Sequence, residues 1–379
     1  MKSTLTQNQA RLLYVSESDK SITSLSKVID GRTTLYFDDE IGHTYTAEIE
    51  NIDKYYDEEY HIYDESDEDD VLYKVVDGVK IFRQQHQLDV LQRKISIEPG
   101  MNILDYGCAK GTVLKRLSSI VPGINPHLFD VSQMYTHLWK NFIPVSNFSS
   151  YQVKSEWVGK MQLITSFFAF EHTPDPIKEL TTIQGLLSPD GYVYMIVPNM
   201  YENTGDFIVA DHIHHYSKPS LRYLFQQCGL EILEIDEKSH FAAFIIVAKN
   251  TQGAISVDSQ DDEVQRVKGD VEDIAGYWSG MQTKIQVFES ISSSKTAAIY
   301  GAGVYGMFIA STLKKFDNVK LFIDQNPLLI NSELLGVPVF SPDKYDVNFE
   351  VLYVGLNPLI AKEVISKLQL PEHVEVFYL

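Results

Sequence analysis

The segment 211–217, "DHIHHYS", places three histidines within four positions. Histidine changes charge near neutral pH, so it serves both as a general base and as a metal ligand. In an extended stretch His212 and His214 face the same side, which is a ligand-like spacing. The sequence offers no third ligand with convincing spacing, and metal sites normally need three or four. We therefore predict no metal site and favour a catalytic base, with a purely structural polar loop as the alternative.

A glycine turn at 103–111, "ILDYGCAKG", follows an apolar run and precedes a helical pattern. In a pyrophosphate-binding turn the strand runs straight into the glycines. Here Asp105 comes first and would repel a phosphate, but it can hold an ammonium group. S-adenosylmethionine carries an ammonium, a carboxylate and a sulfonium. Gly107 permits close backbone approach, and the helix N-terminus beyond Gly111 can receive the carboxylate.

Two further elements extend this site. Asp130 ends the next apolar run, where a carboxylate can accept both hydroxyls of a ribose. The segment 166–176, "SFFAFEHTPDP", follows another strand, at the edge where open α/β sheets bind ligands. We take Phe167, Phe168 and His172 as candidate cofactor contacts. The alternatives are that the two phenylalanines belong to the core and that the histidine only holds the loop together.

The elements that must position these residues alternate between strands and helices. This order predicts an α/β fold with a parallel, doubly wound sheet. Two successive late strands predict an antiparallel pair at its edge. The predicted strands are 101–106, 125–130, 161–170, 191–199, 230–236 and 240–249, and the predicted helices include 111–120, 176–187 and 220–228.

We predict four regions along the chain. Residues 1–79 form an N-terminal region with a hairpin near 33–49 and an acidic, tyrosine-rich stretch at 55–70. That stretch is either a solvated connector or a lid over the substrate. Residues 80–250 form the main domain, 251–269 a polar linker, and 270–379 a second, smaller nucleotide-fold-like unit.

The smaller unit contains its own glycine turn, "IYGAGVYG" at 299–306. Gly301, Gly303 and Gly306 follow a strand and precede a helix, and Asp324 ends the next strand. By pattern alone this matches a dinucleotide fingerprint, so the segment raises the possibility of bound NAD.

Together, the elements around Asp105, Gly107, Gly111 and Asp130, the turn at 166–176 and the strand segment 186–199 resemble the class I S-adenosylmethionine-dependent methyltransferases. The resemblance implies a Rossmann-like sheet with S-adenosylmethionine as the cofactor. The chain departs from many members at Ala109, where they carry a third glycine.

Residues 80–379 also resemble the bacterial sugar C-methyltransferases, in which a similar C-terminal unit accompanies the methyltransferase domain without nicotinamide chemistry. The segment 211–217 is similar to their Glu-His-x-x-Tyr-Phe-Ser segment, which makes His212 the catalytic histidine. If carbon is methylated, an enolate forms, and His214, His215 or Tyr216 could donate a hydrogen bond to it. Those enzymes usually begin with a cysteine-rich zinc module, whereas this chain has no cysteine before Cys108.

Composition narrows the partners. A formal charge of −20 argues against nucleic acid, which requires clustered Lys and Arg. The N-terminus lacks a signal-peptide core, and the longest apolar run, 241–248, is too short to span a bilayer.

We expect a cytoplasmic enzyme that methylates a nucleotide-linked sugar in the synthesis of a surface glycan or a secondary metabolite. The sequence leaves open whether the protein forms a homo-oligomer. The alternatives are an O-methyltransferase of a polysaccharide end or other small molecule, and a non-catalytic nucleotide- or cofactor-binding protein.

Overall fold

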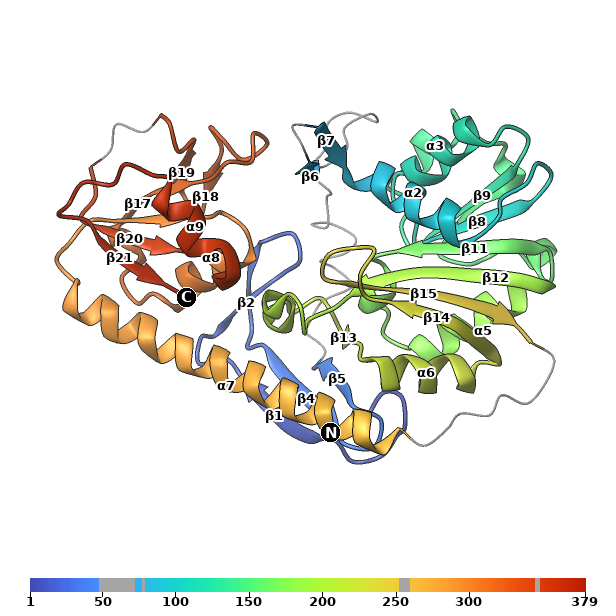
Figure 1. Ribbon diagram of the computed structural model, residues 1–379, viewed down its shortest axis with the longest axis horizontal. Helices are drawn as coiled ribbons and strands as arrows, with labels where there is room; N and C mark the ends of the chain where they lie inside the picture. Colours follow the sequence, from blue (N-terminus) through green and yellow to red (C-terminus); the bar gives the residue numbers. More distant parts are fainter. Residues whose placement is uncertain (48–71, 77–78, 252–259, 345–347) are drawn as a thin grey trace.

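The computed structural model describes residues 1–47, 72–76, 79–251, 260–344 and 348–379. Figure 1 shows two α/β units, one in green and yellow and one in orange and red, with the blue N-terminal strands between them. The predicted lid or connector at 55–70 lies outside the described residues.

The larger unit is built on a seven-stranded sheet with the order β10-β9-β8-β11-β12-β15-β14. Neighbouring strands run parallel except at β15, which is antiparallel to both β12 and β14. This confirms the predicted parallel sheet with an antiparallel edge. The strands are β8 (Asn102–Tyr106), β9 (Asn125–Asp130), β10 (Phe148–Ser150), β11 (Met161–Phe167), β12 (Leu187–Pro198), β14 (Leu230–Asp236) and β15 (Ala243–Asn250).

Alternating side chains of this sheet fill two cores, one on each face. Leu104 and Ile164 pack on one face with Leu180 and Leu221 from the helices α5 (Pro176–Leu186) and α6 (Lys218–Gln227). Ile103 and Leu163, one residue earlier on the same strands, pack on the other face. There they meet α2 (Arg83–Lys94) and α3 (Thr112–Ile120). The strand period of two therefore places these neighbours on opposite faces of the sheet. Because the strands β8 to β12 run parallel, the loops that follow them lie at one edge.

The smaller unit is a six-stranded sheet with the order β18-β19-β17-β16-β20-β21. Only β18 is antiparallel to its neighbour, so this unit is the second Rossmann-like fold that the sequence predicts. Its elements are β16 (Ala297–Tyr300), α8 (Val304–Thr312), β17 (Val319–Ile323), β18 (Glu333–Leu334), β19 (Val337–Phe340), β20 (Val351–Val354), α9 (Pro358–Ser366) and β21 (Glu375–Tyr378).

Helix α7 (Asp261–Ile291) joins the two units and corrects the predicted linker. The sequence predicted a linker at 251–269, but the helix already begins at Asp261. Its acidic start, which gave the linker composition, places three carboxylates in the first turn, where they stabilise the positive end of a helix. Val264, Val267 and Val271 then recur at helical spacing and are buried. Of the helices in the described ranges, none is both long and apolar enough to cross a membrane.

The N-terminal strands include the predicted hairpin, in which β4 (Thr34–Asp38) pairs antiparallel with β5 (His43–Thr46). They form a four-stranded sheet with the order β1-β4-β5-β13. Its last strand, β13, consists of His214 and His215, so the histidine segment belongs to the N-terminal sheet. The other strands are β1 (Arg11–Val15), the pair β2 (Lys20–Ile22) and β3 (Val28–Asp30), and the pair β6 (Leu72–Val76) and β7 (Val79–Phe82).

Candidate active site

The glycine turn after β8 holds the carboxylate of Asp130. Gly107 has a φ of +78°, and a Cβ there would lie 2.5 Å from the Cβ of Ala169. Ala109 is also left-handed, and its N–H donates to Oδ2 of Asp130 at 2.8 Å. The N–H of Ser132 donates to Oδ1 at 3.0 Å. Each carboxylate oxygen can accept more than one hydrogen bond, so Asp130 is fixed in place while still able to accept ribose hydroxyls.

Asp105 lies at the end of the neighbouring strand and is almost fully buried. Thr165 donates to it at 2.9 Å. Burial, together with the charge of Asp130, raises the pKa of Asp105 to about 7. A cationic ligand would favour its ionised form. Two acids beside a glycine-containing turn thus suit the ammonium, sulfonium and ribose of S-adenosylmethionine, and the structure brings together Asp105, Gly107 and Asp130 as predicted. Gly111, with a φ of +72°, is the N-cap of α3.

The three other predicted cofactor contacts, Phe167, Phe168 and His172, lie in three different environments. Phe167 packs on Tyr194, with ring centroids 5.9 Å apart, in the core beneath the sheet edge. Phe168 lines a cavity, and the guanidinium carbon of Arg83 lies over its ring, 4.4 Å from the ring centroid. His172 lies edge-on against His212, with ring centroids 4.8 Å apart, and so belongs to the histidine cluster.

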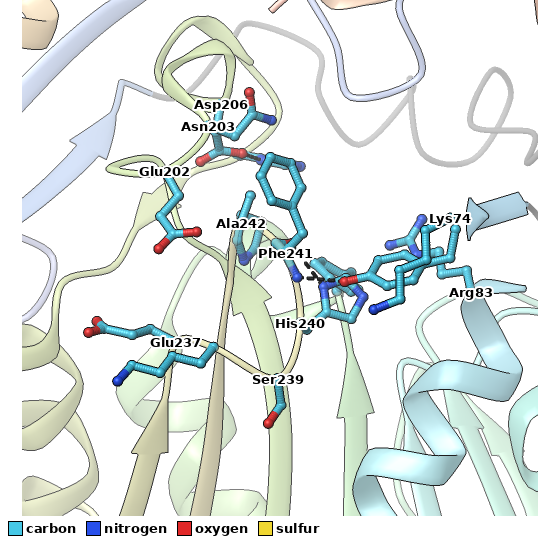
Figure 2. Close-up of a pocket in the computed structure, with 15 residues that line it drawn as sticks. Lys74, Arg83, Glu202, Asn203, Asp206, Glu237, Ser239, His240, Phe241 and Ala242 are labelled. Carbon is cyan, nitrogen blue, oxygen red and sulfur yellow. Dashed lines mark hydrogen bonds and ion pairs between the residues drawn. The ribbon is translucent and has the colours of Figure 1, made fainter. Parts of the chain in front are cut away.

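The cavity has a volume of about 910 Å³, which is large enough for a ligand of drug size. Figure 2 shows Lys74 and Arg83 on one side and Glu202 and Glu237 on the other. The lining also includes the rings of Tyr73, Phe168, His240 and Phe241, and the histidine that the sequence singled out, His212. Charges of both signs and flat rings therefore face one space.

His212 shares a carboxylate with His215. Nδ1 of His212 lies 2.6 Å from Oδ1 of Asp206, and Nδ1 of His215 lies 3.0 Å from Oδ2. Burial alone would raise the pKa of Asp206, but the two imidazoles outweigh it and hold that pKa well below its usual value. Burial alone would lower the pKa of His212, but the Asp206 carboxylate outweighs it and raises the pKa to about 9. The ligand-free protein therefore carries a protonated His212 at neutral pH.

Sequence analysis missed Asp206, which lies on a short helical turn, η5 (Thr204–Ile208). Its only signal is an acid six residues before His212. The acid that directly precedes His212 in the sequence, Asp211, bonds to the N-terminal region. It accepts from the N–H of Ser24 at 2.6 Å and from its Oγ at 2.7 Å, and thus anchors the loop to the N-terminal region.

The prediction that His212 and His214 face the same side is wrong. Nδ1 of His214 lies 3.0 Å from Nε2 of His43 in the N-terminal sheet, and burial lowers the pKa of both rings. The reason is that the extended pairing with β5 begins only at His214, so strand alternation does not reach back to His212.

The predicted hydrogen-bond donors also lie elsewhere. Tyr216 is buried in the core, and its hydroxyl donates to the carbonyl of Phe170 at 3.4 Å. His215 is enclosed between Asp206 and Thr46. None of His214, His215 and Tyr216 is among the cavity-lining residues, so the structure does not place them to donate to an acceptor there.

The second glycine turn repeats the geometry of the first. The N–H of Ala302 donates to Oδ2 of Asp324 at 2.6 Å, as Ala109 does to Asp130. The helix that follows, α8, contacts the larger unit. The hydroxyl of its Tyr305 donates to Oδ1 of Asn203 at 2.7 Å and accepts from the N–H of Gly205 at 3.1 Å. The smaller unit thereby holds the loop that carries the cavity wall.

Comparison with known proteins agrees with this geometry. Residues 81–235 match the family model described as a methyltransferase domain. Together with the strand order and the two acids, this match defines the larger unit as a class I S-adenosylmethionine-dependent methyltransferase domain, whose cofactor is S-adenosylmethionine. Among curated proteins the chain is similar to C-methyltransferase NovU of Streptomyces niveus, with 23% identity over 226 residues. The alignment covers 55% of this chain and 54% of that protein, so the chain spans about half the length of this relative.

Two solved structures are similar to part of the chain at low identity. An S-adenosylmethionine-dependent methyltransferase from Aquifex aeolicus has 18% identity and a TM-score of 0.36, covering 43% of this chain and 89% of that one. The [4+2]-cyclase SpnF has 15% identity and a TM-score of 0.39, covering 48% of this chain and 87% of that one.

Proposed function

We propose that this protein transfers the methyl group of S-adenosylmethionine to a nucleotide-linked sugar bound in the 910 Å³ cavity. The observation that carries the proposal is the pair formed by His212 and Asp206 on the cavity wall. The same cavity is lined by Phe168, the residue that directly follows β11. When bound, the cofactor supplies a methyl group already activated by sulfonium, so the protein mainly needs to align the acceptor and exclude water.

The side chains of the cavity support a sugar acceptor. Glu202, Asn203 and Ser239 offer hydrogen-bonding groups suited to hydroxyls, and the rings of Tyr73 and Phe241 offer flat apolar surfaces for a sugar face or a base. On the side that Figure 2 shows with Lys74 and Arg83, the positive charge suits a diphosphate. The resemblance of the segment 211–217 to that of the sugar C-methyltransferases supports the same class.

We assign activation of the acceptor to His212. A sugar hydroxyl, or a C–H beside a ketone, is too weakly acidic to react unaided at neutral pH, and a positioned base contributes roughly 10²–10⁴-fold. Asp206 fixes the orientation of the ring through Nδ1, which directs Nε2 away from that partner. Since the pKa of about 9 keeps the ring protonated in the ligand-free protein, positive charge must enter the site before Nε2 can accept a proton.

Oxygen methylation is a second candidate, and one observation favours it. The side chains expected to donate to an enolate, His214, His215 and Tyr216, do not line the cavity. The similarity to C-methyltransferase NovU supports carbon instead.

A turnover screen tests the proposal. The enzyme is incubated with S-adenosylmethionine labelled in its methyl group and with nucleotide-sugars, including 4-keto sugars. We expect a labelled sugar, and NMR of the product distinguishes methyl on carbon from methyl on oxygen. Calorimetric titration with S-adenosylmethionine and with NAD should show binding of the former only. No binding of S-adenosylmethionine would overturn the proposal.

A further inference from the structure

Three potential metal ligands converge at the cavity wall. Glu171, His172 and His212 each offer a ligand atom, and these atoms lie within 4.8 Å of one another. Glu171 and His172 come from the short helical turn η4 (Phe170–His172) after β11, and His212 comes from the loop before β13. Forty positions of sequence separate the two loops, so their meeting depends on the fold and not on local spacing.

Both imidazoles are oriented through their other nitrogen. Nδ1 of His212 lies 2.6 Å from the carboxylate of Asp206, and Nδ1 of His172 lies 2.7 Å from the carbonyl oxygen of Asp211. Metal-binding histidines usually make this second contact, to a carboxylate or a backbone carbonyl, because it fixes the ring and the tautomer. On each ring a metal would be met by Nε2, the nitrogen that does not make this contact.

Glu171 supplies an independent observation. Glu171 is 1% exposed, and its Oε2 has no hydrogen-bond partner among the residues that the structure describes. A buried polar atom without a partner is costly, and a buried carboxylate more so, unless a cation or a donor meets it. The sequence-based argument against a metal rested on the lack of a third ligand near His212, and the fold provides two.

We propose that Glu171, His172 and His212 bind a divalent first-row transition metal ion. Two imidazoles and one carboxylate suit such ions and leave coordination positions open, unlike a closed structural site. Because His212 lines the cavity, the open positions would be available to an oxygen of the acceptor. This catalytic part, but not the metal site itself, rests on the proposed function.

In that reaction the ion acts as a Lewis acid. It polarises the acceptor oxygen, whose proton is released to water. For O-methylation, that oxygen forms the new bond to the methyl carbon. The bond between methyl and sulfur breaks with its electron pair remaining on sulfur, so the sulfonium becomes a neutral thioether. This scheme keeps the methyl transfer of the proposed function, but the metal ion replaces the imidazole of His212 as the group that activates the acceptor, and His212 contributes as one of the ligands.

Metal binding is measured without any acceptor. The full-length protein is treated with a chelator, dialysed, and titrated with Co²⁺ followed by visible absorption and with Mn²⁺ followed by loss of the free-ion EPR signal. We expect one ion per chain with micromolar or tighter affinity. Glu171→Gln and His172→Gln, checked for folding by circular dichroism, should each weaken binding by tenfold or more.

His127→Gln is the matched control. His127 is buried in the same domain and its Nδ1 lies 3.0 Å from a backbone carbonyl, that of Asn125, but it is outside the cluster. It should bind metal like the unmodified protein. The proposal is overturned if neither ion binds, or if the Glu171 and His172 variants bind as tightly as the control.

A second measurement separates the metal site from its role. Once a methyl acceptor is in hand, chelation should remove at least 90% of turnover, and the divalent ion should restore it. Full turnover after verified metal removal would overturn the Lewis-acid role. Failure to find any acceptor would count against the proposed function alone, since Co²⁺ binding is measured independently of it.

Discussion

Oδ1 of Asp206 lies 2.6 Å from Nδ1 of His212. Asp206 belongs to a turn that the smaller unit holds through the hydrogen bond between the N–H of Gly205 and the hydroxyl of Tyr305. The imidazole is therefore fixed by a chain of contacts that begins outside the methyltransferase domain. His212 lines the cavity, whereas its neighbour on the same carboxylate, His215, is fully enclosed. This difference is the reason for proposing His212, and not His215, as the histidine that acts on the acceptor.

His212→Ala should leave S-adenosylmethionine affinity within twofold and lower turnover by about 10²-fold or more, since it removes the group that activates the acceptor. His214→Ala should cost less turnover, because that ring is buried against His43. Calorimetry and single-turnover kinetics measure the two effects. Equal losses in both variants would mean that the segment acts only as structure.

Asp130→Ala should weaken S-adenosylmethionine binding by a few kcal/mol, because two ribose hydroxyls lose a charged acceptor. Asp324→Ala is the matched control. It removes the corresponding acid, with the same backbone hydrogen bond, from the smaller unit. We expect cofactor affinity to survive that change. If Asp324→Ala weakens it as much, the two glycine turns share one ligand, contrary to the proposed assignment.

Asp105 should make stability depend on pH. Its pKa rises from about 3.8 unfolded to about 7 folded, so the folded state favours the protonated form. The contribution to stability is fully present below pH 3.8 and is lost as the pH rises through 7. Relative to Asp105→Asn, the unmodified protein should lose on the order of a few kcal/mol between pH 4 and 8. Urea unfolding at several pH values measures this; a constant difference would show that Asp105 is not perturbed.

Tyr305→Phe should lower turnover without weakening cofactor binding. The change removes the acceptor for the N–H of Gly205 and the donor to Asn203, and thus loosens the turn that carries Asp206. We expect a stability loss of about 1–3 kcal/mol. Tyr277→Phe is the control: it removes the hydroxyl of a neighbouring α7 tyrosine that has no hydrogen-bond partner within the described part of the chain. Unchanged turnover in Tyr305→Phe would show that the turn keeps its geometry unaided.

The sheet and the cofactor turn were predictable because their signals are local. Buried strands appear as apolar runs, and Asp105, Gly107 and Asp130 stand at strand ends where parallel topology brings them together. The cluster around His212 was not predictable in this way. Glu171 and Asp206 reach it from separate turns, and the alternation assumed for His212 and His214 fails where the extended pairing stops. The helix start at Asp261 was misread because acids are typical both of linkers and of helix N-termini.

Strand β13 makes the histidine segment the edge partner of β5, and Asp211 binds Ser24. Residues 1–47 and 204–217 are therefore one structural module, although the whole cofactor-binding sheet edge separates them in sequence. An exchange of acceptor preference between related enzymes would have to transplant both segments together. A graft of either one alone would leave strand edges unpaired and the loop of His212 without the contacts that anchor it.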